Sequence, residues 1–110
     1  MGDRANVYVH AGDAPGVYLY THWNGTLLPA TVAHALERGK SRWEHEQYLA
    51  RIIFCEMVQG FERELNGFGI SAAVGDGEDR IIDVDTEKLE VTIGGVALPF
   101  SDFIAAFGHF

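Results

Sequence analysis

The sequence predicts a single α+β domain, an antiparallel sheet with helices packed on one face. Three observations predict this class. Alternating apolar and polar residues mark two short segments near the start of the chain, a long run without Gly or Pro fills the middle, and further alternating segments follow between Gly-rich turns. The length of 110 residues suits one core, so one domain over residues 1–110 is expected.

The N-terminal segments predict a β-hairpin. Residues 6–10 place Val7 and Val9 on one face, and residues 17–22 repeat the alternation. Between them, residues 12–16 contain two glycines and a proline, which is typical of a turn. The two strands are therefore expected to pair with each other.

Two helices are expected next. Pro29 suits the first turn of a helix that runs to about residue 38, and Gly39 suits the position just after its end. Ser41 and Glu44 have the spacing of a capping box, which predicts a second helix over 41–59. Because residues 52–58 contain a single polar side chain, this helix is expected to be buried nearly all round.

The second half predicts a meander of strands followed by a short helix. Gly94 and Gly95 are typical of a hairpin turn, and Ser101 is expected to cap the terminal helix. The expected order along the chain is ββααββββα, with late strands over 68–74, 80–85, 88–93 and 96–98.

Composition limits the cellular setting. The single cysteine, Cys55, excludes an internal disulfide, and its apolar surroundings predict a buried, inert thiol. The first residues lack the apolar run of a signal peptide, and the longest apolar stretch is too short to span a membrane. A cytoplasmic protein without membrane contact is expected.

Negative charge is concentrated in one part of the chain. Of the net charge of −8, residues 56–90 carry almost all, with three bases against ten acids: Glu56, Glu62, Glu64, Asp76, Glu78, Asp79, Asp83, Asp85, Glu87 and Glu90. Such a field disfavours direct contact with a nucleic-acid backbone. It suits a basic partner or serves solubility.

Three strings resemble a family: VYLYTHWNG (17–25), SRWEHEQYLARIIFCEM (41–57) and GFGIS (67–71). In them the chain resembles a small family of uncharacterised proteins from bacteriophages, mobile elements and other prokaryotes. The resemblance covers about two thirds of the chain. It implies a phage-like genomic setting but no activity and no catalytic residues.

Motifs of common catalytic and cofactor sites fail in detail. Residues 39–41 (Gly-Lys-Ser) lack the earlier glycine and strand of a P-loop, and residues 67–72 start a strand where a dinucleotide fingerprint opens a helix. Residues 83–87 carry alternating carboxylates, but the glycine and glutamate of an EF-hand loop are missing, so these side chains are read as a strand's solvent face. The histidines have no zinc spacing: His10, His22, His34, His45 and His109. No cofactor, metal or catalytic residue is assigned.

Two groups of residues remain as binding candidates. The outward face of the hairpin gathers rings on which nucleobases can stack, unless a helix covers them as ordinary core: Tyr8, His10, Tyr18, Tyr20 and His22, beside Trp23. On the long helix, Glu44, Tyr48, Arg51 and Cys55 share one stripe. Arg51 stands in an apolar run, so it is expected to pair with an internal acid or a ligand phosphate.

The leading hypothesis is a non-catalytic binding protein that sequesters a small anionic nucleotide signal, as a phage counter-defence protein would. Its ligand-binding residues are Tyr18, Tyr20, His22, Trp23, Arg38, Lys40, Arg42 and Arg51. A first alternative is an acidic inhibitor that occupies the nucleic-acid-binding surface of a host effector protein. A second alternative is a small hydrolase or transferase that uses histidine and carboxylate side chains. A homo-oligomer is compatible with each.

Overall fold

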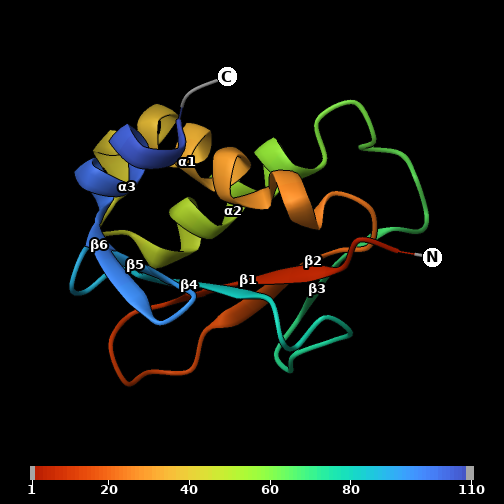
Figure 1. Ribbon diagram of the computed structural model, residues 1–110, viewed down its shortest axis with the longest axis horizontal. Coiled ribbons are helices and arrows are strands. Elements are labelled where there is room, and N and C mark those ends of the chain that lie inside the picture. The colour runs from red at the N-terminus through yellow and green to blue at the C-terminus, as the bar shows by residue number, and fades with distance from the viewer. Residues whose placement is uncertain (1, 109–110) are drawn as a thin grey trace.

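Two layers make up the protein, a six-stranded sheet and three α-helices that lie on one face of it (Figure 1). This computed structural model describes residues 2–108. The strands are β1 (Ala5–His10), β2 (Val17–Thr21), β3 (Phe68–Ser71), β4 (Ile81–Asp85), β5 (Glu90–Ile93) and β6 (Val96–Pro99). The helices are α1 (Leu28–Arg38), α2 (Glu46–Met57) and α3 (Phe100–Phe107), with 3-10 helices η1 (Gly25–Leu27) and η2 (Lys40–Arg42) before α1 and α2.

The α+β class and the helices on one face are confirmed, but the sheet is mixed rather than antiparallel. The strands lie in the order β3-β2-β1-β4-β5-β6, and β1 runs parallel to β4. The expected hairpins β1–β2 and β5–β6 are present, and Gly94 and Gly95 both have positive φ. The chain order differs from the expected one by the two 3-10 helices.

The connection between β3 and β4 explains the mixed sheet. β3 pairs with β2 at one edge, so residues 72–80 must cross to the far side of β1 before β4 begins. They cross on the face without helices, where the Asp76 carbonyl accepts a hydrogen bond from Asn6 Nδ2 at 2.9 Å. The expected strand over 68–74 ends at Ser71, whose Oγ accepts a hydrogen bond from the Ala73 N–H.

The core lies between the sheet and the helices. Alternation places Val7, Val9, Leu19 and Val84 on the helix side, all buried. From the helices, the buried side chains are Leu28, Val32, Ala33, Ala35, Leu36, Leu49, Ile53, Met57, Phe100 and Phe103. The three helices therefore present one apolar stripe each to the sheet.

The second helix differs from its prediction in start and burial. It begins at Glu46 rather than at Ser41, and no capping box forms. Residues 40–45 instead turn so that Trp43 can reach the core, where its Nε1 donates to the Leu36 carbonyl and its ring contacts Phe100. Only a stripe of α2 is buried, so the prediction of a helix buried all round is wrong.

The terminal helix is also capped differently. Pro99 is the residue before its first turn, and Ser101 lies inside the helix, exposed. Phe103 and Phe107 lie four residues apart on one face of this helix, with ring centroids 4.6 Å apart. Among residues 2–108 there is no helix with the length and apolar character needed to cross a membrane.

Candidate functional site

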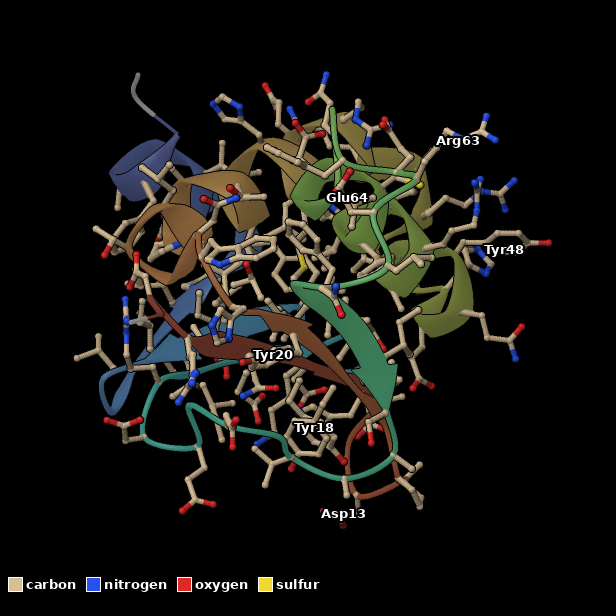
Figure 2. The ribbon with its side chains drawn as sticks, turned by 90° about the vertical axis from the view of Figure 1, so that its right-hand side faces the viewer. Asp13, Tyr18, Tyr20, Tyr48, Arg63 and Glu64 are labelled. Atoms are coloured by element: carbon tan, nitrogen blue, oxygen red, sulfur yellow. The ribbon has the colours of Figure 1, made fainter. Side chains whose placement is uncertain are left out.

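The face of the sheet without helices carries the aromatic candidates. Strand pairing sets Tyr8 beside Tyr18 on one side and beside Asp83 on the other, and sets Asn6 beside Tyr20. These side chains point away from the core, and Figure 2 shows Tyr18 and Tyr20 on the side of the sheet opposite the helices. We call this surface the open face. The rings on it are only half-buried, because no helix covers them.

Three rings form a continuous stack on the open face. The ring centroids of Tyr18 and Tyr8 are 4.4 Å apart, and those of Tyr8 and His10 are 4.8 Å apart. The Tyr8 hydroxyl accepts a hydrogen bond from the Gly16 N–H, which fixes the turn after β1 against the stack. The stack is therefore part of a built structure and not a row of independent rings.

His10 is held at both ring nitrogens. Its Nδ1 lies 2.8 Å from the Gly12 carbonyl, which can only accept, and its Nε2 lies 2.6 Å from Asp83 Oδ1. Burial of the ring opposes its charged form, but these two hydrogen bonds and the nearby carboxylates outweigh burial, so the pKa of His10 is raised above 6.5. Both ring nitrogens are engaged in these contacts, so neither is free to act as a general base or metal ligand in this arrangement.

Asp85 organises the turns at the end of the open face. Its Oδ1 accepts hydrogen bonds from the N–H groups of Gly12, Glu87 and Lys88. Burial raises the cost of its charge, but the three donors outweigh it and lower the pKa of Asp85. Asp85 does lie on the face of β4 opposite Ile82 and Val84, as predicted. It is buried, however, so the prediction that its side chain is exposed to solvent is wrong.

An acidic hollow opens beside the ring stack. It measures about 470 Å³ and lies between the turn after β1 and the β4–β5 hairpin. Its lining contains His10, Lys88 and five carboxylates, those of Asp13, Asp83, Asp85, Glu87 and Glu90. Within residues 2–108, no group of three or more His, Cys, Asp or Glu side chains has a metal-binding arrangement. The hollow presents negative charge rather than a coordination site.

The basic candidates lie in the helical layer, on the other side of the sheet from Tyr18 and Tyr20. Arg38 donates to Glu56 and to the Ile52 carbonyl. Lys40 pairs with Glu37 at 2.9 Å, and the Arg42 guanidinium lies over the Tyr48 ring. The structure therefore does not bring these cations together with the hairpin rings.

Arg51 and Cys55 are exposed on α2, against expectation. No carboxylate among residues 2–108 lies within 4 Å of the Arg51 guanidinium, so the predicted internal ion pair is absent there. The reason is the rotation of α2: Leu49, Ile53 and Met57 face the sheet, and the stripe that carries Arg51 and Cys55 faces solvent.

His22 and Trp23 follow β2 and lie near the outer strand. His22 Nδ1 lies 2.9 Å from the Tyr20 hydroxyl and accepts a hydrogen bond from Arg4 Nε. Trp23 is 46% exposed and packs edge-on against Phe68. Gly67 is required beside it, because a Cβ there would fall 2.0 Å from Trp23 Cζ3 and the φ of Gly67 is +94°. His109 lies outside the described residues.

Sequence reasoning missed the contact between His10 and the carboxylates. The Asp-x-Asp-x-Glu run at 83–87 is the available signal, but by itself it predicts only the solvent face of a strand. The parallel pairing of β1 with β4 sets His10 opposite Asp85, and this pairing has no local sequence signature.

Comparison with known proteins found no matching family model, no matching curated protein and no matching solved structure. The resemblance to the phage and mobile-element family thus stays a prediction.

Proposed function

We propose that the protein is a non-catalytic binding domain whose open face binds a basic protein. The observation that carries this proposal is the acidic hollow beside the Tyr18–Tyr8–His10 stack. Carboxylates in such a cluster attract a basic partner during diffusional encounter, and the flat rings beside them supply contact area. Because the chain resembles phage proteins, the first partners to test are host effector proteins that bind nucleic acids through a basic surface.

Other functions receive less support from the same geometry. The hairpin rings and the basic side chains of the helical layer lie on opposite sides of the sheet, so one nucleotide cannot contact both groups. A phosphate bound on the open face would also lie beside the carboxylates of the acidic hollow and be repelled by them. A hydrolase that used His10 would need a nitrogen of that ring free to accept a proton, and both nitrogens of His10 are occupied. Nucleotide binding stays a prediction, and a screen of mono-, di- and cyclic nucleotides that leaves the melting temperature unchanged would contradict it.

The test measures association of the full chain with a panel of basic nucleic-acid-binding domains, with acidic domains of similar size as controls. We expect binding to basic domains only, a steep fall with added salt, and displacement by duplex DNA. Binding that is indifferent to salt would contradict the proposal.

A pair of charge reversals locates the binding face. Asp13→Lys with Glu87→Lys changes two exposed carboxylates of the acidic hollow, and each reversal adds two charges, so the net charge goes from −8 to −4. Glu44→Lys with Asp102→Lys makes the same change on exposed positions in the helical layer. We expect the first pair to slow association about tenfold or more and the second to have a much smaller effect. Equal effects would show that only net charge matters.

A further inference from the structure

β3 is an outer strand whose free backbone groups can be identified. The His22 N–H donates to the Gly67 carbonyl, and this pair continues the register in which Tyr20 faces Gly69. Hydrogen-bonded pairs alternate along an antiparallel ladder, so the backbone groups of Gly69 and Ser71 face β2. Those of Phe68 and Ile70 therefore point outward, and they offer two N–H donors and two carbonyl acceptors.

The opposite edge of the sheet offers less. The Phe100 N–H donates to the Leu89 carbonyl, so by the same alternation Val96 and Leu98 face β5, and Ala97 and Pro99 face outward. Proline has no N–H, and β6 leads directly into α3. β3 is as short as β6, with four residues, but it has no proline, no charged residue and an Ile70 side chain that is 61% exposed, so it lacks two of the features that keep edge strands unpaired.

Apolar side chains surround the outward edge of β3 on its helix side. Phe68 contacts the ring of Phe61, and the exposed apolar side chains near this end of the sheet include Trp23, Phe61 and Ile70. Figure 2 shows β3 at the front of the molecule, and among residues 2–108 no further strand pairs with its outer edge. On the open-face side, a Cβ at Gly69 would have no heavy atom within 4 Å, so no side chain of this protein covers β3 at Gly69.

The charges on the open face favour a basic occupant. The loop before β3 carries Glu62 and Glu64 around Arg63, a net charge of −1, and the loop after it carries Asp76, Glu78 and Asp79 across the open face toward β1. Arg80, at the end of that second loop, is neutralised by Asp3 at 2.6 Å. A second copy of this chain, with its own charge of −8, would be repelled by the same carboxylates.

We propose that β3 accepts an extended segment of a basic protein as a seventh strand, with apolar residues of that segment toward the helix side and Lys or Arg toward the open face. The inference rests on the proposed function, since it names how a basic partner would attach. Main-chain hydrogen bonds to Phe68 and Ile70 would supply affinity, and the alternating side chains would supply selectivity.

The experiment uses the ¹⁵N-labelled full chain and a blocked peptide of alternating lysine and valine, seven residues long. We expect hydrogen exchange at the Phe68 and Ile70 amides to slow tenfold or more when the peptide binds. The Gly69 and Ser71 amides already bond to β2, so they should change little. Peptide binding without protection of Phe68 and Ile70, or no binding at all, would overturn the proposal.

Control peptides keep the protein unaltered. A peptide with N-methyl groups on alternate residues keeps its charge but cannot form the ladder, so its affinity should fall at least tenfold. A peptide of the same composition with its lysines in one block tests the alternation in the same way. Equal binding of either peptide would overturn strand addition and leave only charge attraction.

Variants at the two edges supply a matched pair. Ile70→Pro removes an outward N–H of β3, and Ala97→Pro removes one of β6. We expect the first to weaken peptide binding at least tenfold and the second to leave it unchanged. Because Ile70→Pro could disturb pairing with β2, Ile70→Lys is the second variant; it keeps the backbone donor, and its added charge should weaken binding several-fold.

The outcomes separate this inference from the proposed function. If basic domains bind and the open-face reversals slow them while Phe68 and Ile70 stay unprotected, the partner uses the open face and strand addition is wrong. If those amides are protected at high protein concentration without peptide, together with dimer formation by light scattering, a second copy occupies the edge and the basic occupant is wrong.

Discussion

The two faces of the sheet are stabilised by different means. On the helix side, Val7, Val9 and Leu19 are buried against apolar side chains of the helices. On the open face, stacked rings, the His10–Asp83 contact and the bonds to Asp85 hold the turns in place. Apolar burial responds little to pH, whereas hydrogen bonds to titrating groups respond strongly. Stability should therefore depend on the helix side, and pH sensitivity on the open face.

The largest effect is expected for Ile53→Ala, which opens a cavity between α2 and the sheet. Ile53 is fully buried, so the variant should lower the free energy of unfolding by about 2–5 kcal/mol. Denaturant titration measures this loss, with Cys55→Ala on the exposed side of the same helix as the control. A loss below about 1 kcal/mol would mean that the core lies elsewhere.

Asp85→Ala should be the most damaging change on the open face. It leaves three backbone N–H groups without their acceptor, which should lower the free energy of unfolding by about 1–3 kcal/mol at neutral pH. The folded-state pKa of Asp85 is lowered from 3.8, so its contribution is present above that value and is lost as pH falls through the folded pKa. Unfolding measured from pH 7 to acid should show wild type and variant converging. A constant difference over this range would contradict the role given to its charge.

His10→Phe keeps a ring on Tyr8 and removes both hydrogen bonds. We expect a loss of about 0.5–1.5 kcal/mol at pH 6. Because the pKa of His10 is raised in the folded state, its contribution is complete below about 6.5 and is lost as pH rises through the folded pKa. Thermal unfolding at pH 6 and pH 9 should show the difference shrinking at the higher pH. A stability difference that grows with pH would contradict the raised pKa of His10. The matched control is His45→Phe, a change at an exposed histidine just before α2.

Arg51→Ala should have the smallest effect. The side chain is exposed and makes no ion pair with residues 2–108, so the free energy of unfolding should change by less than about 0.5 kcal/mol. Denaturant titration checks this directly. A loss above about 1 kcal/mol would restore the paired arginine that the sequence predicts.

Sequence alone was sufficient for several elements that depend on neighbouring residues, although the helix caps expected at Ser41 and Ser101 do not form. Alternation predicts the hairpin β1–β2, Pro29 and Gly39 predict the limits of α1, and Gly94 with Gly95 predicts the turn before β6. Each signal acts within a few residues, so no distant partner is needed to interpret it. The concentration of acids in residues 56–90 was equally plain from the sequence.

Distant contacts decided the rest. Trp43 delays the start of α2 because its ring packs in the core, and the rotation of α2 exposes Arg51 and Cys55. The crossing of residues 72–80 makes β4 parallel to β1, and this pairing alone brings Asp83 to His10. A strand's local pattern fixes which of its residues share a face but not which strand lies beside it. The neighbour is chosen by long-range packing, so the acidic hollow and the free edge of β3 could be located only in the folded chain.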